Sequence, residues 1–412
     1  DNKNMNNDTD IIIVGGGLIG SALAIALSSI GFDVTVVDRQ SNKLTKSKNF
    51  DGRAYALSHA SIRMLKVLGI WNYFKENAQP ILDIKVSDGR VGEGASDWFL
   101  HFDHQELEEG PMGHLIEDRY IREALKTDIE MSKQIKYIYN AEVISQNVKD
   151  TGVSLKLSDG QVLRAQLLVG CDGRNSKIAQ WSNISHVGWN YNQTALVCAL
   201  SHEKQHFGVA HQFFNPAGPL AILPLKGNKS SIVWTETIDR AKHINDMCDE
   251  DYLNALSPFI GNFLGSINLV GDRFSYPLGL SLADSFIAKR TVLVGDSAHG
   301  IHPLAGQGLN LGLKDIAALT EVLALAKRRG ESFSSKQVLE RYQKWRRFDT
   351  SAMAFTTDSI NKLFSNDNII LRSMRDIGLG SVNATPHLRR GFMRHAAGLS
   401  GDLPKLLQGQ II

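Results

Sequence analysis

A glycine pattern near the start of the chain could bind a dinucleotide. Gly15, Gly17 and Gly20 fit GxGxxG between an apolar run and a helix-like run, and Asp38 ends the next apolar run. Such glycines permit a tight turn and let backbone N–H groups approach a pyrophosphate, while the acid binds ribose hydroxyls. The pattern does not separate FAD from NAD, and a glycine-rich turn without a ligand is the simpler alternative. Asp38 disfavours the 2′-phosphate of NADP, although Arg39 beside it weakens that exclusion.

A second chemical cluster lies in the stretch RTVLVGDSAHGIHPLAGQGLNLGL, residues 290–313. An acid follows a strand-like run, and a loop with a proline and two glycines then leads into a helix-like pattern. The residues that matter there are Asp296, Pro303, Gly306, Gly308, Leu309 and Asn310. A helix N-terminus presents unpaired N–H donors and a partial positive charge, and glycines let a ligand approach it closely. The stretch therefore predicts a site for a group that carries or develops negative charge.

Other kinds of catalytic site have weaker support. His299 and His302 could suggest a metal, but a zinc site needs a third protein ligand and none is indicated. A Ser-His-Asp triad lacks the GxSxG elbow that would support it. Cys171, Cys198 and Cys248 form no CxxC pair. We therefore expect no metal, no disulfide framework and a reducing compartment.

Length and charge exclude further classes of protein. The 412 residues are too many for one ordinary compact core, so two or three domains are expected. The net charge of +2 argues against a nucleic-acid partner. Residues 11–32 carry no charge and are long enough to span a bilayer, but their period changes at Gly15. We therefore expect a strand, a turn and a helix there.

The elements that must position these residues follow an α/β pattern. Residues 11–37 predict a βαβ unit, and Ser58 is expected to cap a second helix that stops at Gly69. Residues 134–170 predict a hairpin or meander, and β-type runs recur from 187 to 275. Because no clean linker separates these parts, we expect interleaved domains.

Three separated blocks resemble the class A flavoprotein aromatic hydroxylases, which have the para-hydroxybenzoate hydroxylase fold. The blocks are GGGLIG with Asp38, LLVGCDGRNS at 167–176 (the DG motif) and GDSAHGIHPLAGQGLNLGLKD at 295–315 (the GD motif). Further stretches at 51–71, 218–225 and 389–404 agree. Within the class, the chain is most similar to the ubiquinone-biosynthesis hydroxylases. The resemblance covers nearly the whole chain in the right order.

The resemblance implies an α/β fold with a Rossmann-like FAD-binding domain interleaved with an antiparallel β-sheet substrate domain, followed by C-terminal helices. The expected boundaries are 1–80, 106–183 and 276–345 for the FAD-binding domain, 81–105 and 184–275 for the substrate domain, and 346–412 for the C-terminal helical region.

The resemblance also implies roles around FAD. Asp296 is expected to hold a ribityl hydroxyl, and the backbone from Gly306 to Asn310 to lie along the flavin ring. Pro303 would wall the ring near the carbon that reacts with oxygen. The positive end of the following helix would face the flavin edge that gains negative charge on reduction.

Four more residues are implied in cofactor binding by their match to family positions. Arg53 and Arg119 match arginines near the cofactor, with ordinary ion pairing as the alternative. Asp172 and Gly173 are the aspartate and glycine that give the DG motif its name.

The implied reaction is hydroxylation of the aromatic ring of a polyprenylated phenol by a C4a-hydroperoxyflavin, formed from reduced FAD and O2. No protein base is assigned. Residues 187–235 are expected to wall the substrate pocket, with the stretch GPLAILPL near the flavin. The alternatives are a hydroxylase of a soluble aromatic, or a low-activity flavin-binding scaffold in a quinone-biosynthesis assembly.

The electron donor is either NAD(P)H or a separate reductase or ferredoxin. The DG motif usually continues past its serine to an arginine, whereas Ala179 stands at that position here. Because alanine has neither charge nor hydrogen-bond donor, we expect poor direct reduction by NADPH or NADH.

The C-terminal stretch 386–412 is basic and partly apolar. It holds Arg389, Arg390, Arg394 and Lys405 against one acid, Asp402. Two interpretations are open, a helix packed on the body or a basic surface that contacts anionic lipid. We expect a cytoplasmic protein, either free or peripheral to the inner membrane, with other ubiquinone-biosynthesis proteins as candidate partners.

Overall fold

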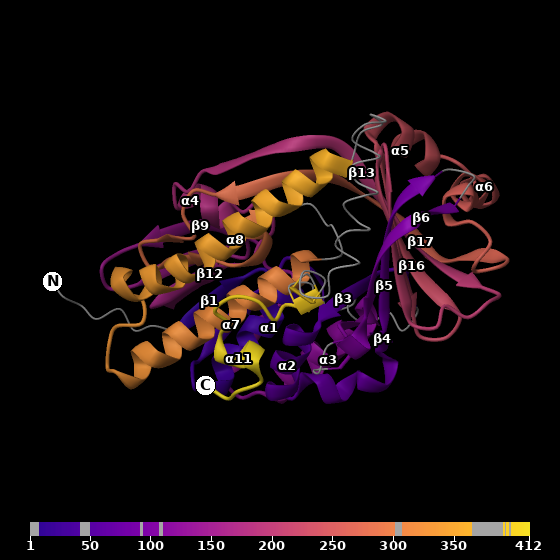
Figure 1. The fold of residues 1–412 in the computed structure, drawn as a ribbon. Helices are drawn as coiled ribbons and strands as arrows, with labels where there is room; N and C mark the ends of the chain where they lie inside the picture. The colour runs from indigo at the N-terminus through magenta and orange to yellow at the C-terminus, as the bar shows by residue number, and fades with distance from the viewer. Residues whose placement is uncertain are drawn as a thin grey trace.

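Two large β-sheets organise the chain and lie next to each other along the molecule (Figure 1). The computed structural model describes residues 8–41, 50–90, 94–106, 110–300, 307–364, 390–391, 393–394 and 397–412. In Figure 1 the sheet that contains β1 and β12 lies in the left-hand part, and the sheet that contains β16 and β17 forms the right-hand side. The mixed α/β architecture expected from the sequence is confirmed.

The first sheet is mostly parallel and buried. Its order is β18 (Ile287–Ala288), β19 (Thr291–Leu293), β12 (Leu167–Gly170), β1 (Ile11–Val14), β2 (Val34–Val37) and β8 (Ile135–Ile138). β1 pairs in parallel with β2 and β12, and α1 (Leu18–Ser29) connects β1 to β2. Strands covered on both faces are continuously apolar, which explains the run IIIV. The predicted βαβ unit is confirmed.

The second sheet is mostly antiparallel. Its order is β20 (His299–Gly300), β17 (Ile267–Ala283), β13 (His186–His202), β16 (Lys229–Thr237), β15 (Gly218–Leu225), β14 (Val209–Asn215), β5 (Asp83–Arg90) and β6 (Gly94–Asp103). α5 (Ile238–Asn245) and α6 (Asp249–Ile260) pack on it. β17 extends beyond residue 275, so the proposed boundary at 276 falls within a strand of this sheet.

Two smaller sheets complete the β structure of the described residues. One has the order β3 (Ala54–Ser58), β7 (Gly113–Glu117) and β4 (Gln79–Ile81), and the other has the order β11 (Val162–Ala165), β10 (Val153–Leu157) and β9 (Val143–Val148). The prediction of one meander over 134–170 was therefore wrong at its ends, because β8 and β12 join the parallel sheet. Short apolar runs look alike whichever sheet they enter, so the pattern could not separate them.

The helices cover the parallel sheet and carry the chain between the sheets. Besides those given above, they are α2 (His59–Val67), α3 (Asp118–Met131), α4 (Lys177–Trp181), α7 (Gln307–Arg328), α8 (Lys336–Phe364) and α11 (Lys405–Gln408). Ser58 caps α2 by accepting a hydrogen bond from the Ser61 N–H, and Gly69 follows the helix with a φ of +79°. α7 begins at Gln307 rather than near Leu309, so Gly308 lies in its first turn instead of in a loop.

The described part of the C-terminal stretch packs on the body. α11 contacts α2 and α7, and Leu406 and Leu407 are buried (Figure 1). The Lys405 N–H donates to the Glu321 carboxylate at 2.8 Å, and the Trp345 indole donates to the Asp402 carbonyl at 3.0 Å. The packing interpretation is therefore correct for residues 397–412, and deleting 386–412 would remove part of the core.

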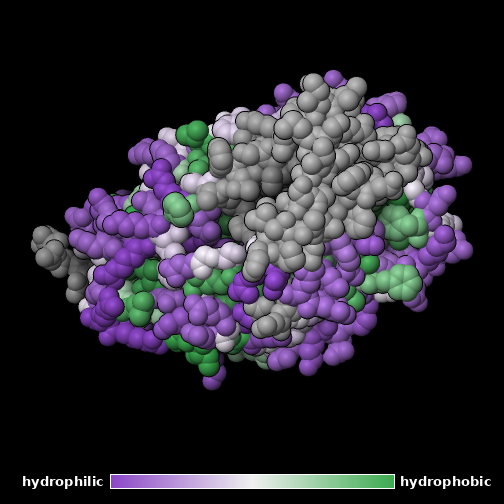
Figure 2. Space-filling view, viewed as in Figure 1, coloured by the Kyte–Doolittle hydropathy of each residue, from purple (hydrophilic) through white to green (hydrophobic). Residues whose placement is uncertain are grey.

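On the face shown in Figure 2, the described residues are mostly hydrophilic, with hydrophobic residues scattered between them. Among the described residues, no helix combines the length and the apolar character needed to cross a bilayer.

Candidate cofactor site

The three glycines of GxGxxG occupy three different environments. A Cβ on Gly15, whose φ is +99°, would lie 2.3 Å from the Cys171 carbonyl oxygen. A Cβ on Gly20 would lie 1.8 Å from the Gly15 carbonyl oxygen, so close helix–strand packing requires glycine there. A Cβ on Gly17 would meet no heavy atom within 4 Å. Only Gly17 therefore keeps space open for something that the chain does not supply.

That space belongs to a cavity of about 230 Å³ at the carboxyl ends of β1, β2 and β12. Its polar lining comes from the backbone of the glycine loop and from the side chains of Asp38, Arg39, Gln40, Glu142, Asp172, Asn175 and Lys177. Ligands of open α/β sheets bind in this position, outside the carboxyl ends of the strands. Pockets that enclose a whole small molecule usually measure about 300–1,000 Å³. The cavity therefore suits one end of an extended dinucleotide, and the donor set fits FAD.

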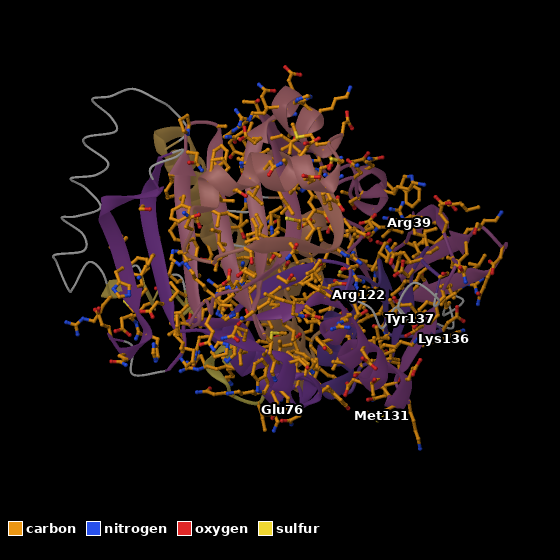
Figure 3. All side chains as sticks on the ribbon, turned by 90° about the vertical axis from the view of Figure 1, so that its right-hand side faces the viewer. Arg39, Glu76, Arg122, Met131, Lys136 and Tyr137 are labelled. Carbon is orange, nitrogen blue, oxygen red and sulfur yellow. The ribbon has the colours of Figure 1, made fainter. Side chains whose placement is uncertain are left out.

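Tyr137 is a polar neighbour of Asp38 that sequence reasoning missed. Its hydroxyl lies 3.0 Å from Asp38 Oδ2 and 2.9 Å from the Gly16 carbonyl oxygen. Burial and the Asp38 carboxylate raise the pKa of the Tyr137 hydroxyl, which therefore remains a donor. Figure 3 shows Tyr137 near Arg122, and both line a small cavity on the α3 side of the glycine loop. Tyr137 thus holds the acid that is expected to bind ribose.

The DG motif stabilises its own turn. The Asp172 carboxylate accepts hydrogen bonds from Ser176 Oγ at 2.6 Å and from the Ile178 N–H at 3.2 Å. Burial raises the pKa of Asp172, although these hydrogen bonds oppose the rise. Gly173 has a φ of +83° and no atom near its Cβ position. Asp172 lines the cavity, but its carboxylate is engaged in capping α4.

Ala179 lies in α4 and is fully buried at 0% exposure. Its N–H donates to Ser176 Oγ at 2.9 Å. An arginine at this position would place a guanidinium in the core, where it would need charged partners. Ala179 therefore packs in the core and does not line the cavity. The electron donor stays a prediction.

The GD motif meets both other blocks. The Ser297 hydroxyl donates to the Gly170 carbonyl oxygen at 2.6 Å, which joins the turn Gly295–Ser297 (η5) to β12. A Cβ on Gly312 of α7 would lie 2.5 Å from Ile19 Cδ1 of α1, so α7 and α1 pack closely at that point. The fold therefore brings the three sequence blocks together in one region.

Asp296 projects from η5 with its side chain 55% exposed, and its nearest described cation is Arg174 Nε at 4.0 Å. Gly308 and Leu309 lie in the first turn of α7, and no atom approaches the Cβ position of Gly308. Asp296 is thus accessible to a ligand, as its expected role requires.

Asn310 connects α7 to the start of α2. Its Oδ1 accepts from the Ser58 N–H at 2.9 Å and from Ser61 Oγ at 2.8 Å, and its Nδ2 donates to the Ala56 carbonyl at 2.8 Å. The side chain is 6% exposed. Its amide is therefore used to fix the helix, and the backbone is what remains for a cofactor.

Arg53 and Arg119 are both engaged by protein groups. Arg53 Nη2 lies 2.7 Å from Asp51 Oδ2 and 3.5 Å from Asp118 Oδ2, and its guanidinium covers the Phe274 ring. Arg119 Nε lies 2.7 Å from Glu117 Oε2. Ion pairing, the alternative interpretation, therefore describes these contacts, while a role near the cofactor remains a prediction.

Other expectations fall partly outside the described residues. Pro303, Gly306 and His302 lie within 301–306, which the structure does not describe. In the described ranges, no group of three His, Cys, Asp or Glu residues is arranged to hold a metal ion.

Comparison with known proteins gives a consistent result. The FAD binding domain family matches residues 8–355. The chain is 40% identical over 403 residues to ubiquinone hydroxylase UbiL of Rhodospirillum rubrum, covering 97% of this chain and 92% of that protein. It is 32% identical over 396 residues to the 3-demethoxyubiquinol 3-hydroxylase of Escherichia coli, covering 96% of this chain and all of that protein.

Solved structures support the fold. The p-nitrophenol 4-monooxygenase PnpA of Pseudomonas putida matches with a TM-score of 0.80 at 18% identity, covering 96% of this chain and 99% of that one. PqsL of Pseudomonas aeruginosa matches with a TM-score of 0.76 at 20% identity, covering 90% of this chain and 99% of that one. The resemblance noted from the three blocks is confirmed.

Proposed function

The chain belongs to the FAD binding domain family, and on that premise we propose that it is an FAD-dependent monooxygenase of ubiquinone biosynthesis. Its substrates are O2 and a polyprenylated phenol, whose ring it hydroxylates. The observation that carries the proposal is that the first two blocks line one cavity, while the third block is hydrogen-bonded to β12 and packed against α1. Relatives named as ubiquinone hydroxylases, aligned over nearly the whole chain, support the substrate class.

We assign the cofactor contacts to residues whose geometry suits them. Gly17 leaves room for the pyrophosphate, and Asp38, held by Tyr137, accepts from the adenosine ribose. Asp296 accepts from a ribityl hydroxyl, and the N-terminus of α7 faces the flavin edge. Bound FAD supplies the activation of O2 when it is reduced. A fixed helix dipole favours the negative charge that accompanies reduction.

We assign the substrate to the eight-stranded sheet, which contributes residues 187–235. β15, with the sequence GPLAILPL, is almost entirely buried and gives this region a rigid apolar wall. Val187 and Trp189 on β13 and Tyr276 on β17 are exposed large apolar side chains. The relatives named as ubiquinone hydroxylases favour a prenylated phenol over a small soluble aromatic, which is the second candidate substrate.

The proposed activity can be measured directly. Purified holoprotein is incubated with O2, NADPH or NADH, and a polyprenylphenol, with and without a ferredoxin and its reductase. We expect a hydroxylated product detected by mass spectrometry and formed with at least one donor. No product with either donor would favour the scaffold alternative, and turnover of phenols without a prenyl chain alone would favour a soluble substrate.

The role of Asp296 is tested by Asp296→Ala. Removing charge-assisted hydrogen bonds, each worth about 1.5–3 kcal/mol, should weaken FAD retention by roughly one to two orders of magnitude. The measurement is the Kd for FAD by flavin fluorescence. Because the side chain is 55% exposed, the thermal unfolding of the apoprotein should not change. Wild-type FAD affinity in this variant would contradict the assignment.

We also propose contact with an anionic membrane surface through the C-terminal stretch. Arg390 and Arg394 are exposed on the part of that stretch preceding the packed residues 397–412. Reversing both charges to Glu should reduce binding to anionic vesicles and leave binding to neutral vesicles unchanged. Lys133→Glu with Lys136→Glu, two exposed lysines elsewhere, is the matched control. Equal vesicle binding by the two double variants would remove the proposal.

A further inference from the structure

A row of ionisable side chains, fully buried at its centre and partly exposed at its far end, lies beneath η5 and links it to α7 and α8. His299 Nε2 lies 2.5 Å from Asp315 Oδ2, and Arg346 Nε lies 2.7 Å from Asp315 Oδ1. Arg346 Nη1 lies 2.6 Å from Asp349 Oδ2, which Lys314 Nζ approaches at 3.4 Å. The side chains of His299, Asp315 and Arg346 are at most 2% exposed. We call these five residues the buried ion row.

Stability alone is a poor reason for such an arrangement. Moving charges out of water is costly, and apolar residues of similar volume often stabilise a core equally well. At Asp315, the attraction of neighbouring positive charges outweighs the cost of burying the carboxylate. Burial raises the pKa of Asp315, but the charges of His299 and Arg346 hold that pKa below its ordinary value. Asp315 is therefore an ionised carboxylate in the core.

The contacts of Asp315 show what this carboxylate organises. Its Oδ2 accepts from the Gly295 N–H at 2.9 Å and also contacts His299, so one carboxylate holds both ends of the GD turn. Asp296 lies between these two anchor points, with its side chain directed outward. Asp315 itself belongs to α7, whose first turn is expected to face the flavin. The carboxylate thus sets where Asp296 stands relative to α7.

The second acid of the row, Asp349, lies farther from η5 than Asp315 does along the chain of contacts. Asp349 lies on α8 and contacts Arg346 and Lys314, and no hydrogen bond or ion pair of the described residues joins it to η5. The row therefore contains one acid that holds the GD turn and one that does not, which allows the two roles to be separated by experiment.

We propose that Asp315 and His299 are positioning residues that fix Asp296 for the cofactor, and that they act on FAD affinity through Asp296. The inference rests on the proposed function because it uses the assigned role of Asp296. The new element is that the Asp315 carboxylate, which does not contact FAD, sets part of the protein's affinity for FAD. A merely structural acid would lower stability without this specific coupling.

A double-mutant cycle tests the coupling. The Kd for FAD is measured from cofactor release on dilution of holoprotein, for wild type, Asp315→Asn, Asp296→Ala and the double variant. We expect Asp315→Asn alone to raise Kd about tenfold, and to raise it less than about twofold when Asp296 is already Ala. Independent effects, in which the double variant shows the product of the two single changes, would overturn the proposal.

Asp349→Asn is the matched control. It removes a carboxylate from the same row, so its melting temperature should fall, but its Kd for FAD should stay within about twofold of wild type. An increase equal to that of Asp315→Asn would show that disturbing any member of the row is enough, and would refute the positioning role.

A second variant keeps the test informative if Asp315→Asn does not fold. His299→Asn removes one contact of Asp315 and leaves its bond to Arg346. His299→Asn should also raise the Kd for FAD, and only in a protein that retains Asp296. Turnover of a polyprenylphenol by the wild type is measured separately. Absence of turnover would reject the proposed substrate. The coupling between Asp315 and Asp296 would still be decided by the double-mutant cycle.

Discussion

Replacing Gly17 by alanine should weaken FAD binding without weakening the fold. The backbone at Gly17 has a φ of −64° and a ψ of −169°, which alanine adopts readily, and no heavy atom lies within 4 Å of the added Cβ. Alanine is a poorer helix N-cap than glycine by about 0.5–1 kcal/mol. It also restricts the unfolded chain, which stabilises by about 0.4–1 kcal/mol. These effects nearly cancel, so the apoprotein should keep its stability.

The cofactor should respond differently, because the new methyl group occupies the space that the cavity keeps open. Losing one charge-assisted contact between the loop and the pyrophosphate costs about 1.5–3 kcal/mol. The Kd for FAD should therefore rise roughly 10- to 150-fold. Fluorescence titration of the apoprotein with FAD gives this value, and thermal unfolding of the same sample gives the stability.

Gly20→Ala is the control within the same motif. Its Cβ would lie 1.8 Å from the Gly15 carbonyl oxygen, so the backbone must move. Such overpacking costs about 1–3 kcal/mol or more, and the apoprotein itself should unfold at a lower temperature. If Gly17→Ala binds FAD like the wild type, or destabilises the apoprotein as much as Gly20→Ala, the assignment of Gly17 to the pyrophosphate is wrong.

Three further predictions concern buried polar groups. Asn310→Ala leaves backbone groups at the start of α2 without partners, so urea unfolding should show a loss of about 2–4 kcal/mol, and an unchanged midpoint would contradict the anchoring role. Tyr137→Phe removes one donor to Asp38 and should raise the Kd for FAD about fivefold, with little change in melting temperature; an unaltered Kd would show that Asp38 needs no support. Burial, assisted by Lys85, lowers the pKa of His211 from 6.5 to about 4. The unfolded chain therefore binds the proton first as the pH falls, and the stability from neutral His211 is complete above pH 6.5 and lost toward pH 4. This loss is at most about 3 kcal/mol, and His211→Gln should flatten it in the pH dependence of the unfolding free energy.

The limits of sequence reasoning are clear at Ala179. The motif indicated that an arginine was missing, and the missing charge suggested a different electron donor. In the structure the Ala179 side chain packs in the core at 0% exposure. The guanidinium of an arginine at this position could therefore not reach a nucleotide unless α4 moved. A motif indicates which residue type is usual at a position. The direction in which that side chain points depends on how the short helix α4 packs.

Arg53 and Arg119 illustrate a related limit. Both positions could be identified by their match to family arginines, yet their partners Asp51, Asp118 and Glu117 follow from local turns and from the packing of the small sheet. A positive charge in a sequence has many available partners, and only the packed fold selects among them.

The sequence alone determined the features that depend on neighbours along the chain. The turn at Gly15, the βαβ unit and the cap and stop of α2 at Ser58 and Gly69 all follow from backbone freedom, capping and the period of apolar residues. These are local effects, and each can be evaluated within a few residues. The family resemblance rests on the same local blocks.

Only the tertiary structure decided which distant groups meet. Tyr137 reaches Asp38 because β8 pairs with β2 in the register Val37↔Ile138, and a shift of one residue would turn its ring to the other face. Asp315 contacts Gly295 and His299, on either side of Asp296, because α7 packs against η5, although nothing in the sequence near it indicates that contact. Register and packing between remote segments are set by the whole core, so no local pattern contains them.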